Sequence, residues 1–320
     1  MKAIVKDRYG SPDVLRLADV DKPVLSADDA ILVRVRATSL NAHDWHMLRG
    51  KPYLARLGEG FRAPKERHLG LDVAGIAEEV GPNVTDIKPG DAVYGSRYGA
   101  FAEYISSKNM VPMPAGLSFE QAAAVPTAGL TALQGLRDKG ALETGERVLV
   151  NGAGGGVGSF AVQIAKALGG HVTAVTRAKN VDMARSIGAD EVIDYAREDF
   201  TRGGGRFDLI LDIGGNLRLS RMRRALTPTG RIVMVAPQPG QWVGPIARIV
   251  GAVITTRLGS RPATAYLADV RRDDLITLKE LIEAGKLRPV IDRTIPFEEI
   301  PEGIRYVESG AAGGKVVVTL

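Results

Sequence analysis

The glycine cluster between Gly152 and Gly158 is the strongest chemical signal in the chain. It follows an apolar, β-branched run at residues 147–151 and leads at once into an amphipathic pattern at residues 159–166. A strand, a tight turn and a helix N-terminus in this order offer unpaired N–H groups and the positive end of a helix dipole, which suit a pyrophosphate. The flanking strand and helix make the motif credible, and a glycine-rich turn without a ligand is the alternative. The residues expected to contact the pyrophosphate are Gly152, Gly155, Gly156, Val157 and Gly158.

The composition fits two globular domains and excludes several kinds of chemistry. With 320 residues, 45% of them hydrophobic and 25% charged, the chain can bury two sizeable cores. It contains no cysteine, which excludes disulfides, thiolate catalysis and cysteine-ligated zinc. The net charge of +5 is spread along the chain without a block of one sign, so nucleic-acid binding is not indicated. No run is apolar enough to span a bilayer and no signal segment is evident, so we expect a cytoplasmic protein.

The first 120 residues have the pattern of a small β-rich domain. Residues 30–37 alternate apolar and charged side chains with period two, as in a half-buried strand. Further strands are expected at residues 70–80 and 92–94, with strong turn signals at 81–83 and 88–91. Many strands joined by such turns predict a barrel or a sandwich-like domain.

The pattern changes near Ser118, where Ser118 and Gln121 form a capping-box signature for a helix that Pro126 interrupts. Strands and helices then alternate, which predicts a doubly wound parallel sheet with crossover helices. The expected strands are residues 148–150, 172–175, 192–193, 209–211 and 232–235, with helices at 157–168 and 181–187 among the connections. After about residue 262 we expect one more helix at 274–284 and a closing strand at 314–318.

Several short segments carry a resemblance to a known family. Besides the glycine cluster they are residues 41–45, 70–75, 79–84, 88–94, 99–104 and 314–317. Together they resemble the medium-chain dehydrogenase/reductase superfamily, and within it the zinc-free quinone oxidoreductase branch. The resemblance implies an α/β protein in which a Rossmann doubly wound parallel-sheet domain is inserted into a GroES-like, β-rich catalytic domain. We accordingly expect the catalytic domain at residues 1–122 and 263–320 and the cofactor domain at residues 123–262.

The end of the second expected Rossmann strand favours NADPH over NADH. NAD-binding versions of this fold carry an acidic residue there, which hydrogen-bonds the ribose 2′-OH. Here the strand ends with Thr176, Arg177 and Lys179, and residues 176–180 include no acid. An arginine pairs with a 2′-phosphate through two parallel hydrogen bonds, whereas an acid repels it. The alternative is that Arg177 and Lys179 are solvated surface charges. Tyr195, after the third strand, resembles the residue that lines the adenosine pocket in the family, but it also fits a strand-end aromatic.

The resemblance also implies that this chain lacks the catalytic zinc of the alcohol dehydrogenases in the superfamily. Those enzymes bind zinc with two cysteines and a histidine. In this sequence the first cysteine position is Asn41, the histidine position is Leu71 and the second cysteine position falls near Pro126. No metal site is therefore expected, and the reaction must be a hydride transfer without a Lewis acid.

Four polar residues are the candidates for the reacting end of the site. The resemblance places residues 41–50 near the nicotinamide, and the expected hydrogen-bond donors are Asn41, Asp44, His46 and Thr127. His46 is the preferred proton donor, with a structural or surface histidine as the alternative. Asp44 has the alternative role of capping a helix. Further cofactor contacts are expected from Asn41, Thr127, Ile213, Val235, Ala236 and Lys315.

These observations predict an NADPH-dependent reductase that transfers hydride to a quinone or an α,β-unsaturated carbonyl. A 2-alkenal or enoyl-type reductase and a non-catalytic NADPH-binding accessory protein are the alternatives. Residues 47–68 and 239–265 are expected to form the substrate wall and entry, so the acceptor is left open. We also expect a homodimer in which residues 253–258 pair edge to edge.

Overall fold

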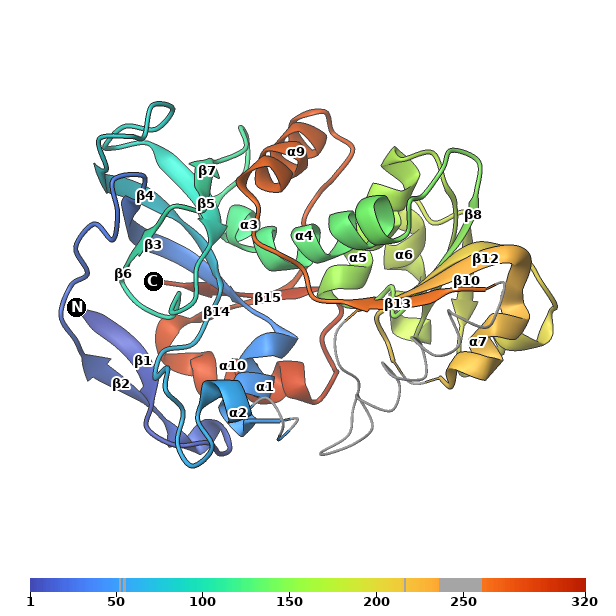
Figure 1. The fold of residues 1–320 in the computed structure, drawn as a ribbon, viewed down its shortest axis with the longest axis horizontal. Coiled ribbons are helices and arrows are strands. Elements are labelled where there is room, and N and C mark those ends of the chain that lie inside the picture. The colour runs from blue at the N-terminus through green and yellow to red at the C-terminus, as the bar shows by residue number, and fades with distance from the viewer. Residues whose placement is uncertain (52, 54–55, 216, 236–260) are drawn as a thin grey trace. The chain divides into compact units, whose positions relative to one another are not determined.

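The computed structural model describes residues 1–51, 53, 56–215, 217–235 and 261–320, which form two compact units (Figure 1). Unit 1 comprises Met1–Ala128, Val270–Gly285 and Pro289–Leu320, and unit 2 comprises Gly129–Asp269 and Lys286–Arg288. Both chain ends therefore belong to unit 1, and unit 2 is an insertion. The boundaries expected from the sequence, at residues 122 and 262, lie a few residues before these.

Unit 1 is built around a seven-stranded sheet in the order β14-β15-β3-β4-β5-β7, with β6 also paired to β3, and a separate two-stranded sheet of β1 and β2. The last strand pairs antiparallel with β3, so that Val316 lies opposite Leu40. This pairing is what joins the two ends of the chain in one domain. The strands are β1 (Lys2–Lys6), β2 (Leu15–Asp19), β3 (Ile31–Leu40), β4 (Asp72–Val80), β5 (Ala92–Ser96), β6 (Tyr104–Ser107), β7 (Met110–Pro112), β14 (Ile291–Pro296) and β15 (Lys315–Thr319).

The helices of unit 1 include the predicted capped helix. Ser118 Oγ accepts from the Gln121 N–H at 3.3 Å, and Gln121 Oε1 accepts from the Ser118 N–H at 3.0 Å, which confirms the capping box at the start of α3. Pro126 begins the next helix, α4, where a missing N–H is harmless, and the first segment of unit 1 ends within α4. The helices are α1 (Ala42–Arg49), α2 (Arg56–Glu59), α3 (Phe119–Ala123), α4 (Pro126–Gln134), α9 (Arg272–Glu283) and α10 (Ile300–Glu308).

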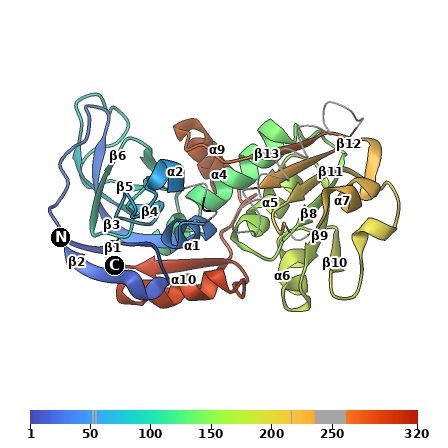
Figure 2. The ribbon, with the colours of Figure 1, turned by 60° about the horizontal axis from the view of Figure 1, so that its bottom comes forward.

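Unit 2 is a parallel sheet in the order β10-β9-β8-β11-β12-β13, and its labelled strands run side by side in Figure 2. Every pairing between neighbouring strands is parallel, as the alternating pattern predicts, and the order is that of a doubly wound dinucleotide-binding sheet. The strands are β8 (Arg147–Asn151), β9 (His171–Thr176), β10 (Glu191–Asp194), β11 (Phe207–Asp212), β12 (Leu226–Val235) and β13 (Ala263–Tyr266). The α-helices of this unit after α4 are α5 (Gly156–Ala167), α6 (Val181–Ser186) and α7 (Leu219–Ala225).

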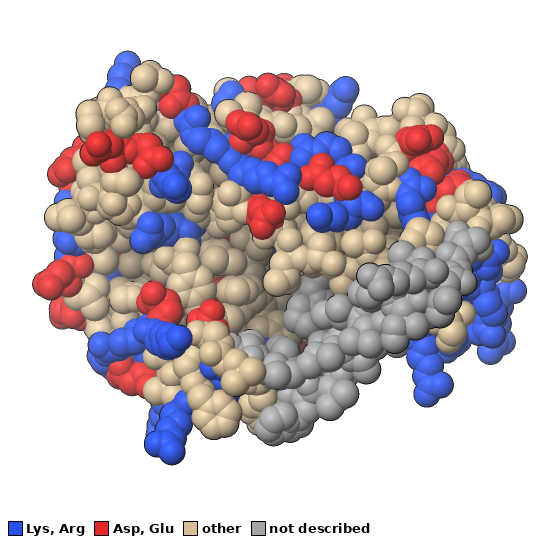
Figure 3. Space-filling model, viewed as in Figure 1, with Lys and Arg blue, Asp and Glu red and all other residues tan. Residues whose placement is uncertain are grey.

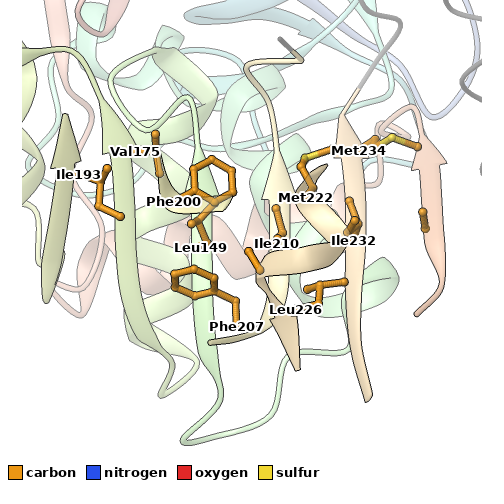
Figure 4. Close-up of a cluster of buried hydrophobic side chains, with 12 residues drawn as sticks. Leu149, Val175, Ile193, Phe200, Phe207, Ile210, Met222, Leu226, Ile232 and Met234 are labelled. Atoms are coloured by element: carbon orange, nitrogen blue, oxygen red, sulfur yellow. The ribbon is translucent and has the colours of Figure 1, made fainter. Parts of the chain in front are cut away.

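The core of unit 2 explains why its strands have nearly continuous apolar sequences. Leu149, Ile210 and Ile232 come from three neighbouring strands and meet Phe200 and Phe207 in one buried cluster (Figure 4). Strands of a parallel sheet are covered on both faces, so both sets of side chains are apolar. This packing fixes the carboxyl ends of β8, β9, β11 and β12, which is where ligands bind in such sheets.

The charge distribution on the surface and the length of the helices bear on whether nucleic acid or a membrane is a partner. On the face shown in Figure 3, lysine and arginine side chains lie among aspartates and glutamates. Within the described residues, no helix combines the length and the apolar character needed to cross a membrane.

Several elements were not foreseen from the sequence, among them β2, β6, β7, α2, β13, β14 and α10. Of these, β13 extends the Rossmann sheet beyond β12, and β14 and α10 flank β15 in unit 1. Ala236 and the expected dimer segment 253–258 lie outside the described residues, as does most of the expected substrate segment 239–265.

Candidate functional site

The glycine loop of unit 2 has the close packing that its sequence requires. Gly152 has φ +94°, a conformation that side-chain-bearing residues rarely adopt. A Cβ on Gly158 would overlap the Gly152 carbonyl oxygen, and a Cβ on Gly154 would overlap Thr176 and Asn180. The loop is therefore pressed between the start of α5 and the end of β9.

Gly155 differs from its neighbours because its missing side chain leaves open space. It is the N-cap of α5 with φ −96°, and among the described residues beyond its chain neighbours the nearest atom to an added Cβ would be the Gly152 carbonyl oxygen at 3.8 Å. No side chain caps the helix, which begins at Gly156 and continues with Val157. The first N–H groups of a twelve-residue helix thus face a cradle that a side chain would fill, and this fits a pyrophosphate.

The end of β9 places two predicted cofactor residues together. Arg177 Nε donates to Tyr195 Oη at 3.1 Å, although the two residues belong to successive loops after β9 and β10. Arg177, Lys179 and Tyr195 are all exposed, whereas Thr176 is buried. A guanidinium held in place at this strand end suits a phosphate, because it can form two parallel hydrogen bonds.

The carboxyl ends of β11 and β12 continue the same edge of the unit 2 sheet. Asp212, at the end of β11, is fully buried and its Oδ1 accepts from Asn151 Nδ2 at 2.7 Å and from the Gly215 N–H at 3.0 Å. Ile213 follows directly and donates its N–H to the Asn151 carbonyl at 3.0 Å. Val235 ends β12. Ile213 and Val235 therefore lie at carboxyl ends of the same sheet as the glycine loop, as the doubly wound fold requires.

In unit 1 the polar residues converge on a buried carboxylate, Asp72, at the start of β4. Its Oδ1 accepts from the Thr127 N–H at 2.8 Å and from the Thr127 hydroxyl at 2.6 Å. Its Oδ2 accepts from Ser39 Oγ at 2.6 Å, Asn41 Nδ2 at 2.9 Å and Lys315 Nζ at 3.1 Å. Asp72 is 0% exposed, so the carboxylate is stabilised by these donors in place of water.

Lys315 supplies the balancing positive charge. It is 3% exposed, and its ammonium also donates to Asn41 Oδ1 at 2.6 Å and to the Leu40 carbonyl at 3.1 Å. The three acceptors use the three N–H bonds of the ammonium. The structure thus places Asn41, Thr127 and Lys315 around one acid, and a direct bond from Lys315 to a cofactor remains a prediction.

Asp44 lies beside this network and stabilises the start of α1. Its Oδ2 accepts from the N–H of the N-cap residue Asn41 at 2.7 Å, and its Oδ1 accepts from the Gly70 N–H at 3.2 Å. Complete burial raises the pKa of the Asp44 carboxyl to about 7, even though both N–H groups favour its charged form. Asp44 thus stabilises the start of α1 from the third position of the helix, as part of a capping box with Asn41, and not as the cap before Trp45 that the sequence offered as an alternative.

The raised pKa of Asp44 makes a prediction for stability against pH. Between the ordinary pKa near 4 and about 7 the folded protein binds this proton and the unfolded chain does not, so stability falls as pH rises. We expect wild type to lose stability relative to Asp44→Asn as the pH rises from about 4.5 to 7.5. Urea unfolding of both proteins across this range measures the difference. If the free energies of unfolding of the two proteins change in parallel with pH, the raised pKa of Asp44 is contradicted. A difference between them that is constant with pH comes from the amide itself and does not bear on this pKa.

His46 lies on the last turn of α1 and is partly buried. Its ring stacks on Trp45 with centroids 3.6 Å apart, and Nδ1 lies 3.2 Å from the Lys51 carbonyl oxygen. Burial lowers the pKa of the imidazole, so the neutral ring dominates at neutral pH. Its Nδ1–H then donates to Lys51, and Nε2 is an acceptor until the ring gains a proton.

Two residues of this network, Ser39 and Asp72, are not among the site residues expected from the sequence. Asp72 directly follows Leu71, the position compared with a zinc ligand, and lies within both the segment 70–75 that carries the resemblance and the strand expected at residues 70–80. The signal that could have found it is a carboxylate at the start of an otherwise apolar strand, since such a charge must be paired when buried. The described residues contain no group of three or more His, Cys, Asp or Glu side chains suited to a metal ion.

Comparisons with known proteins assign the chain to a family. Residues 27–135 match the alcohol dehydrogenase GroES-like domain, and residues 187–318 match the domain described as a zinc-binding dehydrogenase. The 2-methylene-furan-3-one reductase of Solanum lycopersicum is 33% identical, over 99% of this chain and 79% of its own length. The chloroplast envelope quinone oxidoreductase homolog of Arabidopsis thaliana is 31% identical, over 99% of this chain and 98% of its own. The chain belongs to the quinone oxidoreductase branch of the medium-chain dehydrogenase/reductase superfamily.

A solved structure of another quinone oxidoreductase agrees with this assignment. The Escherichia coli quinone oxidoreductase complexed with NADPH has 27% sequence identity and a TM-score of 0.82, with all of both chains covered. This chain thus combines a GroES-like domain and a Rossmann-type parallel-sheet domain, which confirms the fold class expected from the sequence. The chain is an oxidoreductase of the type that uses a nicotinamide cofactor.

Proposed function

We propose that the protein is an NADPH-dependent reductase that transfers hydride, without zinc, to a quinone or an α,β-unsaturated carbonyl. The observation that carries the choice of cofactor is the Arg177–Tyr195 hydrogen bond at the end of β9, beside Lys179. Two exposed cations at this position favour a 2′-phosphate over a free 2′-hydroxyl. The NADPH in the Escherichia coli relative is consistent with this choice.

Unit 2 would hold the cofactor with its own backbone and cations. The N–H groups at the start of α5, from Gly156 and Val157, would bind the pyrophosphate, with Gly155 leaving room for it. Arg177 and Lys179 would pair with the 2′-phosphate. When bound, the cofactor supplies the hydride, and the protein orients it and excludes water.

The acceptor needs one proton after it has taken up the hydride. A quinone or an enone that gains a hydride carries a negative charge on oxygen, and one proton completes the hydroquinone or the saturated carbonyl. His46 is the proposed donor, acting in its protonated form, so the proton-transfer step should become faster as the pH falls towards the pKa of the imidazole. Unchanged turnover in His46→Gln would remove His46 from the mechanism.

The zinc-free part of the proposal depends on which residues are present. The sequence has no cysteine, and Asn41, at the first cysteine position, is hydrogen-bonded to Asp72 and Lys315. The Lys315 ammonium is thus the positive partner of Asp72 in the polar cluster of unit 1. Activity that is unaffected by prolonged dialysis against a chelator is the expected result.

Two alternatives remain for the activity. The names of the tomato and Arabidopsis relatives support enones and quinones about equally, so a 2-alkenal or enoyl-type reductase is the second candidate. The third is a non-catalytic NADPH-binding accessory protein. A homodimer and a cytoplasmic location are also retained as proposals, the first to be tested by sedimentation.

The deciding experiment is NADPH consumption against a panel of quinones, 2-alkenals and enones, with NADH in parallel. Gly155→Ala is the matched control, because among the described residues, its chain neighbours aside, no atom lies closer than 3.8 Å to the added methyl group, which fills the cradle. We expect it to fold normally and to bind NADPH poorly. Stoichiometric NADPH binding without turnover on the whole panel would favour the accessory protein, and a clear preference for NADH would overturn the assignment of Arg177.

A further inference from the structure

The hydrogen bonds around Asp72 fix where the protons of its neighbours point. The carboxylate accepts from the hydroxyls of Ser39 and Thr127, from Asn41 Nδ2 and from Lys315 Nζ, besides the Thr127 N–H. An ionised carboxylate can only accept. The hydroxyl proton of Thr127 is therefore committed to Asp72, and towards any other partner its oxygen acts as an acceptor.

Asn41 has its orientation fixed in the same way. Lys315 donates to Oδ1 at 2.6 Å, and Nδ2 donates to Asp72 at 2.9 Å and, at a longer 3.4 Å, to the Ser39 carbonyl. A flipped amide would place an NH₂ group against an ammonium, so this orientation is strongly favoured. Both N–H bonds of Asn41 are used within unit 1, and Oδ1 retains one lone pair.

We propose that Asp72 and Lys315 are positioning residues that hold Thr127 and Asn41 as hydrogen-bond acceptors for an N–H or O–H group of the ligand. This inference rests on the proposed function. On the cofactor the donor is the carboxamide N–H or a ribose hydroxyl, and on the reaction partner it is the hydroxyl of the reduced product. It reverses the donor roles that the sequence suggested for Thr127 and Asn41, and it leaves proton supply to another group.

Asp72→Asn tests whether residue 72 sets the direction of the hydrogen bonds of Thr127 and Asn41. The amide has the same size as the carboxylate but can accept hydrogen bonds on one side only. With its oxygen towards Lys315, its NH₂ faces Thr127, whose oxygen must then accept and turn its proton away from residue 72. We expect NADPH to bind about 10-fold more weakly in Asp72→Asn and in Thr127→Val, and normally in Thr127→Ser. Asp72→Asn and Thr127→Val both remove the acceptor role of Thr127. The variant that combines them should therefore bind NADPH no more weakly than Asp72→Asn alone.

The measurements are the Kd of NADPH from fluorescence titration, the KM of the acceptor and a thermal melt of each variant. Thr277→Val is the control, because within the described contacts the Thr277 hydroxyl bonds only to the Asp273 carbonyl, in an exposed contact on α9. A raised Kd identifies the cofactor as the donor-bearing ligand, whereas a raised KM at constant Kd identifies the acceptor.

Two results would overturn the inference, and they are distinguishable. If wild type binds and oxidises NADPH but Thr127→Val matches Thr127→Ser in both constants, the positioning role is wrong and the proposed function stands. If wild type does not bind NADPH, the proposed function fails and the inference fails with it. Should Asp72→Asn not fold, the comparison of Thr127→Ser with Thr127→Val still decides.

Discussion

Replacing Lys315 with methionine is expected to lower the free energy of unfolding by about 3–5 kcal/mol. Lys315 is 3% exposed and Asp72 is 0% exposed, so the substitution leaves a buried carboxylate without its counter-charge. It also leaves the Leu40 carbonyl and Asn41 Oδ1 without a donor that they have in wild type. Removing one partner of a buried ion pair is costly for this reason, even where the intact pair adds little.

Urea unfolding at neutral pH measures this loss, and Lys279→Met is the matched control. Lys279 lies in α9 and pairs with Glu283 at 2.7 Å one helical turn away, but the contact is partly exposed. Such surface pairs contribute about 0.3–0.5 kcal/mol. A loss for Lys315→Met as small as that of the control would show that water or a rearrangement stabilises Asp72 equally well. In Asp72→Asn the added loss from Lys315→Met should be smaller, because the buried charge is already absent.

The contrast between these two lysines shows which contacts a sequence can and cannot predict. Lys279 and Glu283 are four residues apart on a helix, a spacing that can be recognised directly. Lys315 and Asp72 are 243 positions apart, and they meet only because β15 pairs with β3 and β3 with β4. No local pattern contains that information. The sequence predicted Lys315 as a cofactor residue from a motif, and the structure shows its hydrogen bonds within unit 1.

The Rossmann part of the fold was predictable because its signals are local. The glycine cluster and the apolar strands each occupy a few neighbouring residues, and the structure has a strand or helix at each. The capping box of Ser118 in unit 1 is a local signal of the same kind. The short strand β13 has a weaker signal, since Ala263–Tyr266 is only four residues long and two of the four are alanine, which is depleted in strands. Its place is set by pairing with β12, a tertiary effect that overrides weak propensity.

Within the site, the polar residues were easier to predict than the direction of their hydrogen bonds. The resemblance implies that Asn41, Thr127 and Asp44 are polar groups near the reacting end of the site, and the sequence analysis expects all three to donate hydrogen bonds. The structure shows which of their atoms donate and which accept. That depends on the five donors that meet at Asp72 and on the two N–H groups that meet at Asp44. Hydrogen-bond direction is a property of the assembled network, so only the structure could supply it.

Replacing Arg177 with serine is expected to weaken NADPH binding about 10–150-fold and to leave NADH binding nearly unchanged. A hydrogen-bonded charge pair contributes about 1.5–3 kcal/mol, which corresponds to that range. The effect is selective because the 2′-phosphate is the only part in which the two cofactors differ. Tyr195 holds Arg177 Nε at 3.1 Å, so Tyr195→Phe should cause a smaller loss in the same direction.

Fluorescence titrations with both cofactors, at low and at physiological salt, measure the discrimination. Arg202→Ser is the matched control, because Arg202 has an 85% exposed side chain and pairs with Asp199 away from the end of β9. In wild type the preference for NADPH should shrink as salt is added, since an exposed ion pair is screened. In Arg177→Ser the remaining preference should depend less on salt, with Lys179 as the remaining cation. Equal affinities for NADPH in wild type and in Arg177→Ser would show that the guanidinium does not bind the phosphate, and the preference would then have to come from Lys179 or be absent.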